Sequence, residues 1–303
     1  MYNIGMQLII KGSKLMKKEI VCRPYRYLID FEKVYQFMVR NYSIDCATGE
    51  KAPSFEYAQT LIDFDREHTY LFSIWEEDGE IVAFCYYEMS PCQVSFSFKK
   101  GYEYLATDVI LYAEQHMGNE EGKVSFSIYN TQEFLVNELK KKHYMKVNEK
   151  PVLIYDLSKP LEYDLPEGFN FVKPDDIDYK KLVQMIWRSF GFDDWHNKDV
   201  TGAYIQQASP HQTKDLDIII SAPNGDYACF AGMWFVADNN LAYLEPLCTA
   251  PEYRNMGLAS ASLSELSKRT KRLGAIHMTG GVNNFYSNLG YKIVSYNEIW
   301  EKE

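Results

Sequence analysis

The chain has 303 residues, of which 46% are apolar and 24% charged, and it carries a formal net charge of -10. This length and apolar content exclude a disordered chain and are sufficient for two packed domains. The acidic charge repels phosphate backbones, so nucleic acid is not expected as a partner, and a cationic substrate such as an amine is favoured. Ordinary solubility charge is the alternative explanation.

The cysteines and the apolar runs exclude further classes of protein. None of the six cysteines stands at C-x-x-C spacing from another, so no zinc site or other metal centre is expected. Lysines interrupt the apolar residues of 1–18, which therefore lack the apolar run and cleavage site of an export signal. No apolar run is long enough to cross a membrane. We expect a soluble cytoplasmic protein with no membrane partner, in which 1–18 form an N-terminal extension.

The first half of the chain predicts an antiparallel meander followed by a helix. In chain order we expect a helix over 31–39, strands over 70–75, 81–89 and 93–98, and a helix over 102–117. Asp78 and Gly79 separate the first two strands. An Asp-Gly step between apolar runs is typical of a tight hairpin, because glycine accepts positive φ.

The second half repeats that order of elements. We expect strands over 169–172, 216–221, 227–236, 241–247 and 275–278 with a last strand from 291, and helices over 177–190, 257–273 and 283–289. The segments 134–144 and 285–291 also resemble each other, which indicates an internal duplication. Pro160, Pro166 and Gly168 mark the join, so the sequence predicts an α+β protein with domains over 19–158 and 159–303.

One strand-to-helix step in the second half carries a recognisable chemistry. The predicted strand ends near Leu247, and a helix begins at an Arg-x-x-Gly-x-Ala sequence formed by Arg254, Gly257 and Ala259. The first turn of a helix leaves N–H groups without partners, and these donors and the helix dipole attract anions. Without a side chain at Gly257, a pyrophosphate can approach the backbone closely.

This step resembles the pyrophosphate loop of the GNAT superfamily of N-acetyltransferases, which reads Gln/Arg-x-x-Gly-x-Gly/Ala. A second motif, from Tyr286 to Leu289, Gly290 and Tyr291, is similar to the ending Tyr-x-x-Leu-Gly-Phe/Tyr of that family. The resemblance implies two tandem GNAT-like domains, each with a mixed, mostly antiparallel twisted sheet flanked by helices. It also implies acetyl-CoA as the cofactor of the C-terminal domain.

The resemblance implies roles for individual residues. Backbone groups of Leu247, Cys248 and Thr249 would pair with the pantetheine arm of coenzyme A. Tyr286 would protonate the leaving thiolate, and its alternative role is that of a core aromatic residue. The pyrophosphate would be held by the backbone amides of Arg254, Asn255, Met256, Gly257, Leu258 and Ala259.

Glu245 is the candidate general base. Strand alternation predicts that it shares a face with Tyr243 and Leu247, and family members often use a carboxylate here, directly or through water. An acceptor amine bound as ammonium must lose a proton before it attacks a carbonyl carbon, and a carboxylate in a partly apolar cleft can accept that proton. The alternative is a structural glutamate that pairs with a cation.

The sequence departs from the family pattern at the pantetheine contact. Thr279 stands where the family often has an asparagine, and either Asn283 or Asn284 could replace it or simply cap the short helix. Cys248 would lie beside the thioester. We interpret it as a small buried residue, because direct transfer in a ternary complex needs no nucleophilic cysteine.

The first half is interpreted as a degenerate copy. Matching Leu105 and Ala106 to the start of the second-half helix puts Tyr104 in place of Gly257 and Gly101 in place of Arg254. A tyrosine ring would crowd the pyrophosphate, so we expect no productive binding of coenzyme A in this half.

Three functions remain open at this stage. The first is an N-acetyltransferase acting on a primary amine of a small molecule or peptide, and the alternative from another class is a non-catalytic coenzyme A-binding sensor or scaffold. The third, an aminoacyl transferase using charged tRNA, is disfavoured by the acidic charge. Homodimer formation is left open.

Overall fold

The computed structural model describes residues 19–61, 63–89, 91–192 and 201–302, without the side chains of 201–203, and divides them into two compact units. As far as it is described, unit 1 takes in Met1–Gln59, Asp63–Pro151 and Val294–Glu303, and unit 2 takes in Thr60–Ile62 and Val152–Ile293. The predicted domain bounds, 19–158 and 159–303, stay a prediction. The predicted extension 1–18 lies outside the described residues.

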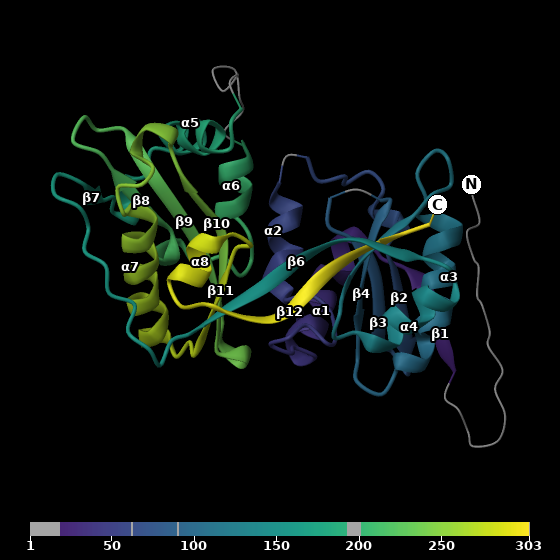
Figure 1. The fold of residues 1–303 in the computed structure, drawn as a ribbon. Coiled ribbons are helices and arrows are strands. Elements are labelled where there is room, and N and C mark those ends of the chain that lie inside the picture. Colours follow the sequence, from purple (N-terminus) through teal and green to yellow (C-terminus); the bar gives the residue numbers. More distant parts are fainter. Residues whose placement is uncertain (1–18, 62, 90, 193–200, 303) are drawn as a thin grey trace. The chain divides into compact units, whose positions relative to one another are not determined.

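Unit 1 is a mixed sheet with helices on both faces (Figure 1). Its sheet has the order β1-β2-β3-β4-β5-β12-β6, in which β4 and β5 are parallel. The helices are α1 Tyr27–Arg40, α2 Ala52–Thr60, α3 Ala106–His116 and α4 Glu133–Lys141. The strands are β1 Ile20–Pro24, β2 Ser73–Glu77, β3 Glu80–Tyr87, β4 Gln93–Phe98, β5 Ser125–Tyr129, β6 Met145–Asp156 and β12 Lys292–Glu301.

Unit 2 repeats this layout with its own elements. Its sheet has the order β6-β11-β10-β9-β8-β7, in which β10 and β11 are parallel and the other pairs antiparallel. The helices are α5 Tyr179–Ser189, α6 Thr201–Gln207, α7 Leu258–Leu273 and α8 Asn284–Asn288. The strands are β7 Asn170–Phe171, β8 Ile218–Ser221, β9 Tyr227–Val236, β10 Leu241–Thr249 and β11 His277–Gly280.

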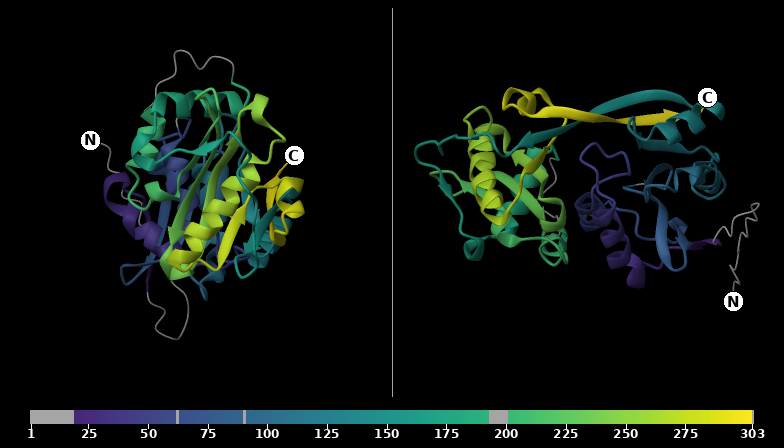
Figure 2. Two further views of the ribbon diagram at one scale, coloured as in Figure 1. Left: turned by 90° about the vertical axis from the view of Figure 1, so that its left-hand side faces the viewer. Right: turned by 90° about the horizontal axis from the view of Figure 1, so that it is seen from below.

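The predicted α+β class with two tandem, mostly antiparallel units is confirmed. The long strand β6 supplies the sheet of both units, because Leu153 to Asp156 pair with β11. The last strand, β12, joins the sheet of unit 1 beside β5. β6 and β12 are the teal and yellow arrows that run next to each other in both Figure 1 and Figure 2.

Strand β10 contributes residues to both cores of unit 2. Leu244 on one face of the sheet packs with Leu263 and Leu266 of α7. Cys248 packs on the other face with Leu182 and Met185 of α5. The sheet is thus covered on both faces, which leaves ends and edges of strands as the places for a ligand.

The local predictions were accurate for regular elements and less so at their ends. Asp78 and Gly79 both adopt positive φ (52° and 81°), which confirms the hairpin between β2 and β3. The strand predicted to start at residue 70 starts at Ser73, because Thr69–Leu71 forms a 3₁₀ turn. Within the described residues, no helix combines the length and apolar character that crossing a membrane requires.

Candidate active site

The parallel strands β10 and β11 separate shortly after they begin. Their backbones pair at Leu241 with His277 and at Ala242 with Met278. One step further, the contact is made by a side chain instead, because the Leu244 N–H donates to Thr279 Oγ1 at 2.7 Å. Beyond this point no strand pairing joins β10 and β11 in the described chain. Beyond Leu244, the edge of β10 that faces β11 is therefore available for an extended ligand.

The separation of the strands coincides with a bulge in β10. The register against β9 shifts between Leu244 and Leu247, so that Glu245 and Pro246 lie opposite Gly232, and the peptide between them is cis. A Cβ built on Gly232 would lie 2.8 Å from the Glu245 carbonyl oxygen. Glycine is therefore required where β9 passes the bulge.

The bulge overturns the predicted alternation around Glu245. Leu244 and Leu247 both pack against the core formed with α7, although they are three residues apart. Strict alternation would have put them on opposite faces. Strict alternation therefore does not hold through this part of β10, because the bulge adds a residue. The face that Glu245 shares with Leu247 stays a prediction.

The N-terminus of α7 is open in the way that an anion site requires. Gly257 caps the helix in the left-handed conformation (φ 84°), and Asn255 also has positive φ (62°). A Cβ built on Gly257 would meet only Pro166 Cγ, at 3.9 Å. In the described chain no backbone carbonyl accepts from the amides of 255–260. These donors and the dipole of a 16-residue helix favour a bound anion.

The side chain of Arg254 binds two backbone carbonyls next to the loop. Its guanidinium donates to the carbonyl of Ser189 at 2.7 Å and to that of Thr249 at 3.3 Å. Arg254 thus joins the C-terminus of α5 to the end of β10, where a cation also complements the helix dipole. The backbone amide of Arg254 already donates to the Pro251 carbonyl at 3.4 Å, so the open donors begin at Asn255.

Tyr286 packs against Gly280, the last residue of β11, and against Gly281, which follows it. It is 6% exposed, and a Cβ on Gly280 or Gly281 would come within 2.8 Å of its ring. Burial raises the pKa of the phenol well above its usual 10, the Gly281 amide opposes the shift, and the charge of nearby Glu245 adds to it. The phenol therefore stays protonated at neutral pH and can donate a proton. Packing in the α7-side core, its alternative role, is also observed.

The departures from the family pattern have structural explanations. Thr279 is buried, and its hydroxyl holds β10 and β11 at the point of separation. Asn283 caps α8 by accepting from the Phe285 amide at 3.2 Å, whereas Asn284 is exposed in the first turn of α8. Burial raises the pKa of the Cys248 thiol, which is 7% exposed, so it is not a reactive nucleophile.

Unit 1 has the same strand separation, but its own chain fills it. β4 and β5 pair only at their beginnings. The Phe98 N–H then donates to the Thr48 carbonyl at 2.7 Å, and the Gln132 side chain donates to the Phe96 carbonyl at 3.2 Å. A Cβ on Gly49 would lie 2.5 Å from Ser97 Oγ. The loop between α1 and α2 thus occupies the strand edge that is open in unit 2.

The helix entrance of unit 1 is closed as well. The N-cap of α3 is Leu105, in a right-handed conformation and 2% exposed, whereas Tyr104 is 55% exposed. Leu105 and Gly257 are the N-cap residues of α3 and α7, so Leu105 rather than Tyr104 corresponds to Gly257. The predicted match is therefore shifted by one residue. The helix of unit 1 therefore lacks the open, side-chain-free entrance.

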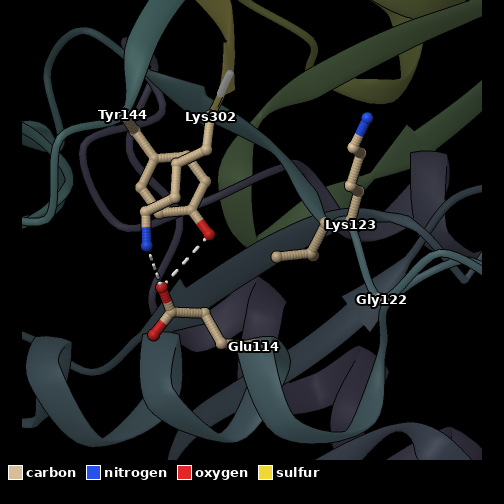
Figure 3. Close-up of a pocket in the computed structure, with 6 residues that line it drawn as sticks. Glu114, Gly122, Lys123, Tyr144 and Lys302 are labelled. Carbon is tan, nitrogen blue, oxygen red and sulfur yellow. Dashed lines mark hydrogen bonds and ion pairs between the residues drawn. The ribbon is translucent and has the colours of Figure 1, made fainter.

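Unit 1 does contain a pocket, at the opposite end of α3 (Figure 3). Glu114, in the last turn of α3, accepts from Tyr144 at 3.1 Å and from Lys302 at 2.9 Å, and it also pairs with Lys142. These contacts satisfy the charged groups locally. In the described ranges no group of three or more His, Cys, Asp or Glu side chains could hold a metal ion.

Two residues near the bulge were missed from the sequence. Asp217 is 3% exposed at the start of β8, and burial raises its pKa to about 7. Gly232 lies next to it. The available signal for Asp217 was a carboxylate directly between Leu216 and three isoleucines, which is unusual for a solvated residue.

Comparison with known proteins agrees with this geometry. A family model described as "Acetyltransferase (GNAT) family" matches residues 180–291, from the first turn of α5 to the end of the Tyr286 motif. The match to the GNAT family lies within unit 2, which is named the GNAT unit. No curated protein matches the chain. The family match covers the strand separation, the bulge and the open helix entrance of the GNAT unit.

Solved structures match both units and show the fold. A GCN5-related N-acetyltransferase from Sphaerobacter thermophilus has a TM-score of 0.59 at 16% identity, covering 94% of this chain and 95% of that one. A tandem GNAT protein from the clavulanic acid biosynthesis pathway has a TM-score of 0.57 at 12% identity, covering 94% and 98%. The C-terminal domain of a putative lysylphosphatidylglycerol synthetase from Agrobacterium fabrum has a TM-score of 0.54 at 12% identity, covering 92% of each chain.

Proposed function

We propose that the GNAT unit transfers an acetyl group from acetyl-CoA to a primary amine of a small molecule or peptide. The observation that carries this proposal is the open N-terminus of α7 directly after an unpaired strand edge. An extended pantetheine arm needs the edge, and a pyrophosphate needs the amides, so the two features together match the two halves of coenzyme A.

The cofactor would be held mainly by backbone groups. Leu247, Cys248 and Thr249 offer the free edge of β10 to the pantetheine amides. The pyrophosphate would lie against the amides of Arg254, Asn255, Met256, Gly257, Leu258 and Ala259. Asn284 stands at the start of α8 and offers an exposed side-chain amide for a further polar contact with the cofactor.

The chemistry divides between Glu245 and Tyr286. Glu245 accepts a proton from the acceptor ammonium, directly or through water, and the amine nitrogen then bonds to the acetyl carbon. As the carbon–sulfur bond breaks, Tyr286 gives its proton to the leaving thiolate. The products are the N-acetylated amine, free coenzyme A and one proton. The electrostatic coupling between Glu245 and the phenol supports their placement at one site.

The setting of the reaction is part of the same proposal. All six cysteines are free thiols, which supports a reducing compartment such as the cytoplasm. The acidic charge supports an amine substrate rather than nucleic acid or an anionic membrane surface. Unit 1 would contribute packing rather than a second cofactor site.

The test is transfer by the purified full chain. Acetyl-CoA is incubated with a panel of primary amines, while release of free thiol and the mass of the acceptor are followed. We expect at least one amine to gain one acetyl group in step with thiol release. Binding of acetyl-CoA without transfer to any amine would favour the sensor or scaffold. Absence of binding would contradict the cofactor assignment.

A further inference from the structure

A lysine and a cysteine of unit 1 are buried against each other in the loop between α1 and α2. Lys51 is 3% exposed, and Cys46 is fully buried. The ammonium nitrogen of Lys51 lies 2.8 Å from Cys46 Sγ. Lysine is almost never buried this completely unless its charge is paired, so the position of Lys51 needs a reason beyond packing.

The contact satisfies the ammonium group poorly. An ammonium group has three donors, and a thiol sulfur is only a weak acceptor. The Glu50 carboxylate lies 3.9 Å from the Lys51 nitrogen, which is beyond hydrogen-bond distance. Among the described residues, Cys46 is the only hydrogen-bond partner of this nitrogen. A buried charge held in this way costs free energy that an apolar side chain of similar length would avoid.

The geometry of the contact suits a covalent link. Hydrogen bonds from nitrogen to oxygen already span about 2.7–3.2 Å, and sulfur is the larger atom, so 2.8 Å is short for a hydrogen bond to sulfur. It is close to the separation that one oxygen atom bonded to both nitrogen and sulfur would set. Cys46 adopts a positive φ of 61°, and its carbonyl accepts from the Gly49 amide at 3.0 Å. The folded loop thus holds the two groups in contact.

The neighbouring amine distinguishes Cys46 from the other buried cysteine of unit 1. Cys85 is also fully buried, but it contacts Met117 Sδ at 3.4 Å and the Ser73 hydroxyl. Burial raises the pKa of the Cys46 thiol to about 11, and Lys51 opposes this rise. Cys46 is therefore slower to oxidise than an exposed thiolate, but an oxidised Cys46 has a nitrogen within reach.

We propose that Lys51 Nζ and Cys46 Sγ form a reversible cross-link through one oxygen atom when the protein is exposed to a peroxide. Starting from ammonium and thiol, two molecules of hydrogen peroxide give the N–O–S link, three water molecules and one proton. Nitrogen and sulfur each lose two electrons, and the two peroxide O–O bonds that break accept all four. Two molecules of a dithiol return these electrons and restore the amine and the thiol, with release of one water molecule. This inference does not depend on acetyl transfer.

The cross-link would fix the segment that closes the strand edge of unit 1. Thr48 and Gly49, which occupy the edge of β4, lie between the two linked residues. Tying the ends of this segment together removes conformations from the unfolded chain, as a disulfide does. The oxidised chain should therefore melt at a higher temperature than the reduced chain, and dithiothreitol should reverse the shift. An unchanged melting temperature of the cross-linked chain would contradict this fixing of the segment.

Tryptic peptides of the full chain test the link itself. Trypsin cleaves the unmodified chain after Arg40, Lys51 and Arg66. After hydrogen peroxide and then iodoacetamide, we expect the peptide 41–66 uncleaved at Lys51 and without an alkyl group on Cys46. It should be heavier than the reduced peptide by about 14 Da, which is one oxygen gained and two hydrogens lost. Dithiothreitol before iodoacetamide should restore the peptide 41–51 with alkylated Cys46, and unfolding in urea before peroxide should prevent the link.

Matched variants locate the two reacting atoms. Lys51→Met and Cys46→Ser should each abolish the product that is about 14 Da heavier, whereas Cys85→Ala should keep it. Three results on the wild-type chain would overturn the proposal, so it stays testable even if a variant does not fold. They are alkylation of Cys46 after peroxide, oxidation of Cys46 with cleavage at Lys51 intact, and a link that has lost two hydrogens without gaining oxygen. An equal yield in urea would show that the fold does not direct the reaction.

Discussion

The two units share one fold and differ where the pantetheine arm of a cofactor would lie. In the GNAT unit the edge of β10 beyond Leu244 is not paired with β11. In unit 1 the matching edge of β4 is paired with Thr48, and Gly49 fits against Ser97 without room for a Cβ. A loop of about ten residues between two helices is thus enough to close a site while the sheet stays the same.

The position of the proposed acid, Tyr286, also differs between the two units. The Tyr291 N–H donates to the Tyr286 carbonyl, and the Tyr144 N–H makes the equivalent bond to Leu139. Leu139, fully buried, therefore replaces the proposed acid in unit 1. Both units thus have the strand separation, and the local residues decide whether it becomes a site.

Closing the open helix entrance of the GNAT unit should have the largest effect. Gly257→Tyr should abolish stabilisation by acetyl-CoA, a loss of about 2.7 kcal/mol at a ligand concentration 100 times Kd. Gly274→Tyr is the matched control, because Gly274 ends the same helix with positive φ and nothing within 4 Å of its Cβ position. Tyr104→Gly should leave binding unchanged. Full acetyl-CoA stabilisation of Gly257→Tyr would contradict the loop assignment.

The second test makes Tyr286 resemble its counterpart in unit 1. Tyr286→Phe should lower kcat by about 10²–10⁴-fold with unchanged acetyl-CoA binding, because it removes the proton donor and keeps the packing. Tyr291→Phe should leave kcat unchanged, because the Tyr291 hydroxyl is buried without a partner among the described residues. Since the pKa of Tyr286 is raised, the wild-type rate should show no loss from its ionisation up to about pH 10. Equal rates for both variants would exclude Tyr286 as the acid.

The third test addresses the general base. Glu245→Gln should lower turnover by about 10–100-fold at neutral pH, with little change in acetyl-CoA affinity, since the amide cannot accept the proton. Glu252→Gln, at an exposed position in the 3₁₀ turn Pro251–Tyr253 after β10, is the control and should stay within twofold of wild type. Steady-state rates across pH 6–9 give the comparison. An unchanged rate for Glu245→Gln would assign proton removal to another group.

The smallest functional effect is expected in unit 1. Gly49→Ala should lower the free energy of unfolding by roughly 2–4 kcal/mol, because the new Cβ meets Ser97 at a positive φ of 124°. Gly79→Ala should cost about 1 kcal/mol, since nothing lies near that Cβ position. Neither change should alter acetyl-CoA affinity per folded molecule. A gain of a second acetyl-CoA site in Gly49→Ala would show that unit 1 is only blocked and not degenerate.

The sequence was sufficient for the parts of the fold that depend on local rules. Asp78 and Gly79 predicted their hairpin because positive φ is a property of those residues. The repeated order of elements predicted two α+β units. Gly257 predicted a helix entrance without a side chain, because a missing Cβ is visible in the sequence. These features need no knowledge of distant contacts.

The closure of unit 1 and the surroundings of Glu245 were decided by tertiary structure. The Thr48 carbonyl accepts a hydrogen bond from Phe98, which is 50 positions later in the sequence. Asp217 lies near the bulge because β8 pairs with β9 and β9 pairs with β10. The bulge places Leu247 on the same face of the sheet as Leu244, whereas strict alternation would place them on opposite faces. Sequence patterns record how one segment alternates, whereas a buried carboxylate beside a glycine depends on which strands become neighbours, and that is settled only when the chain packs.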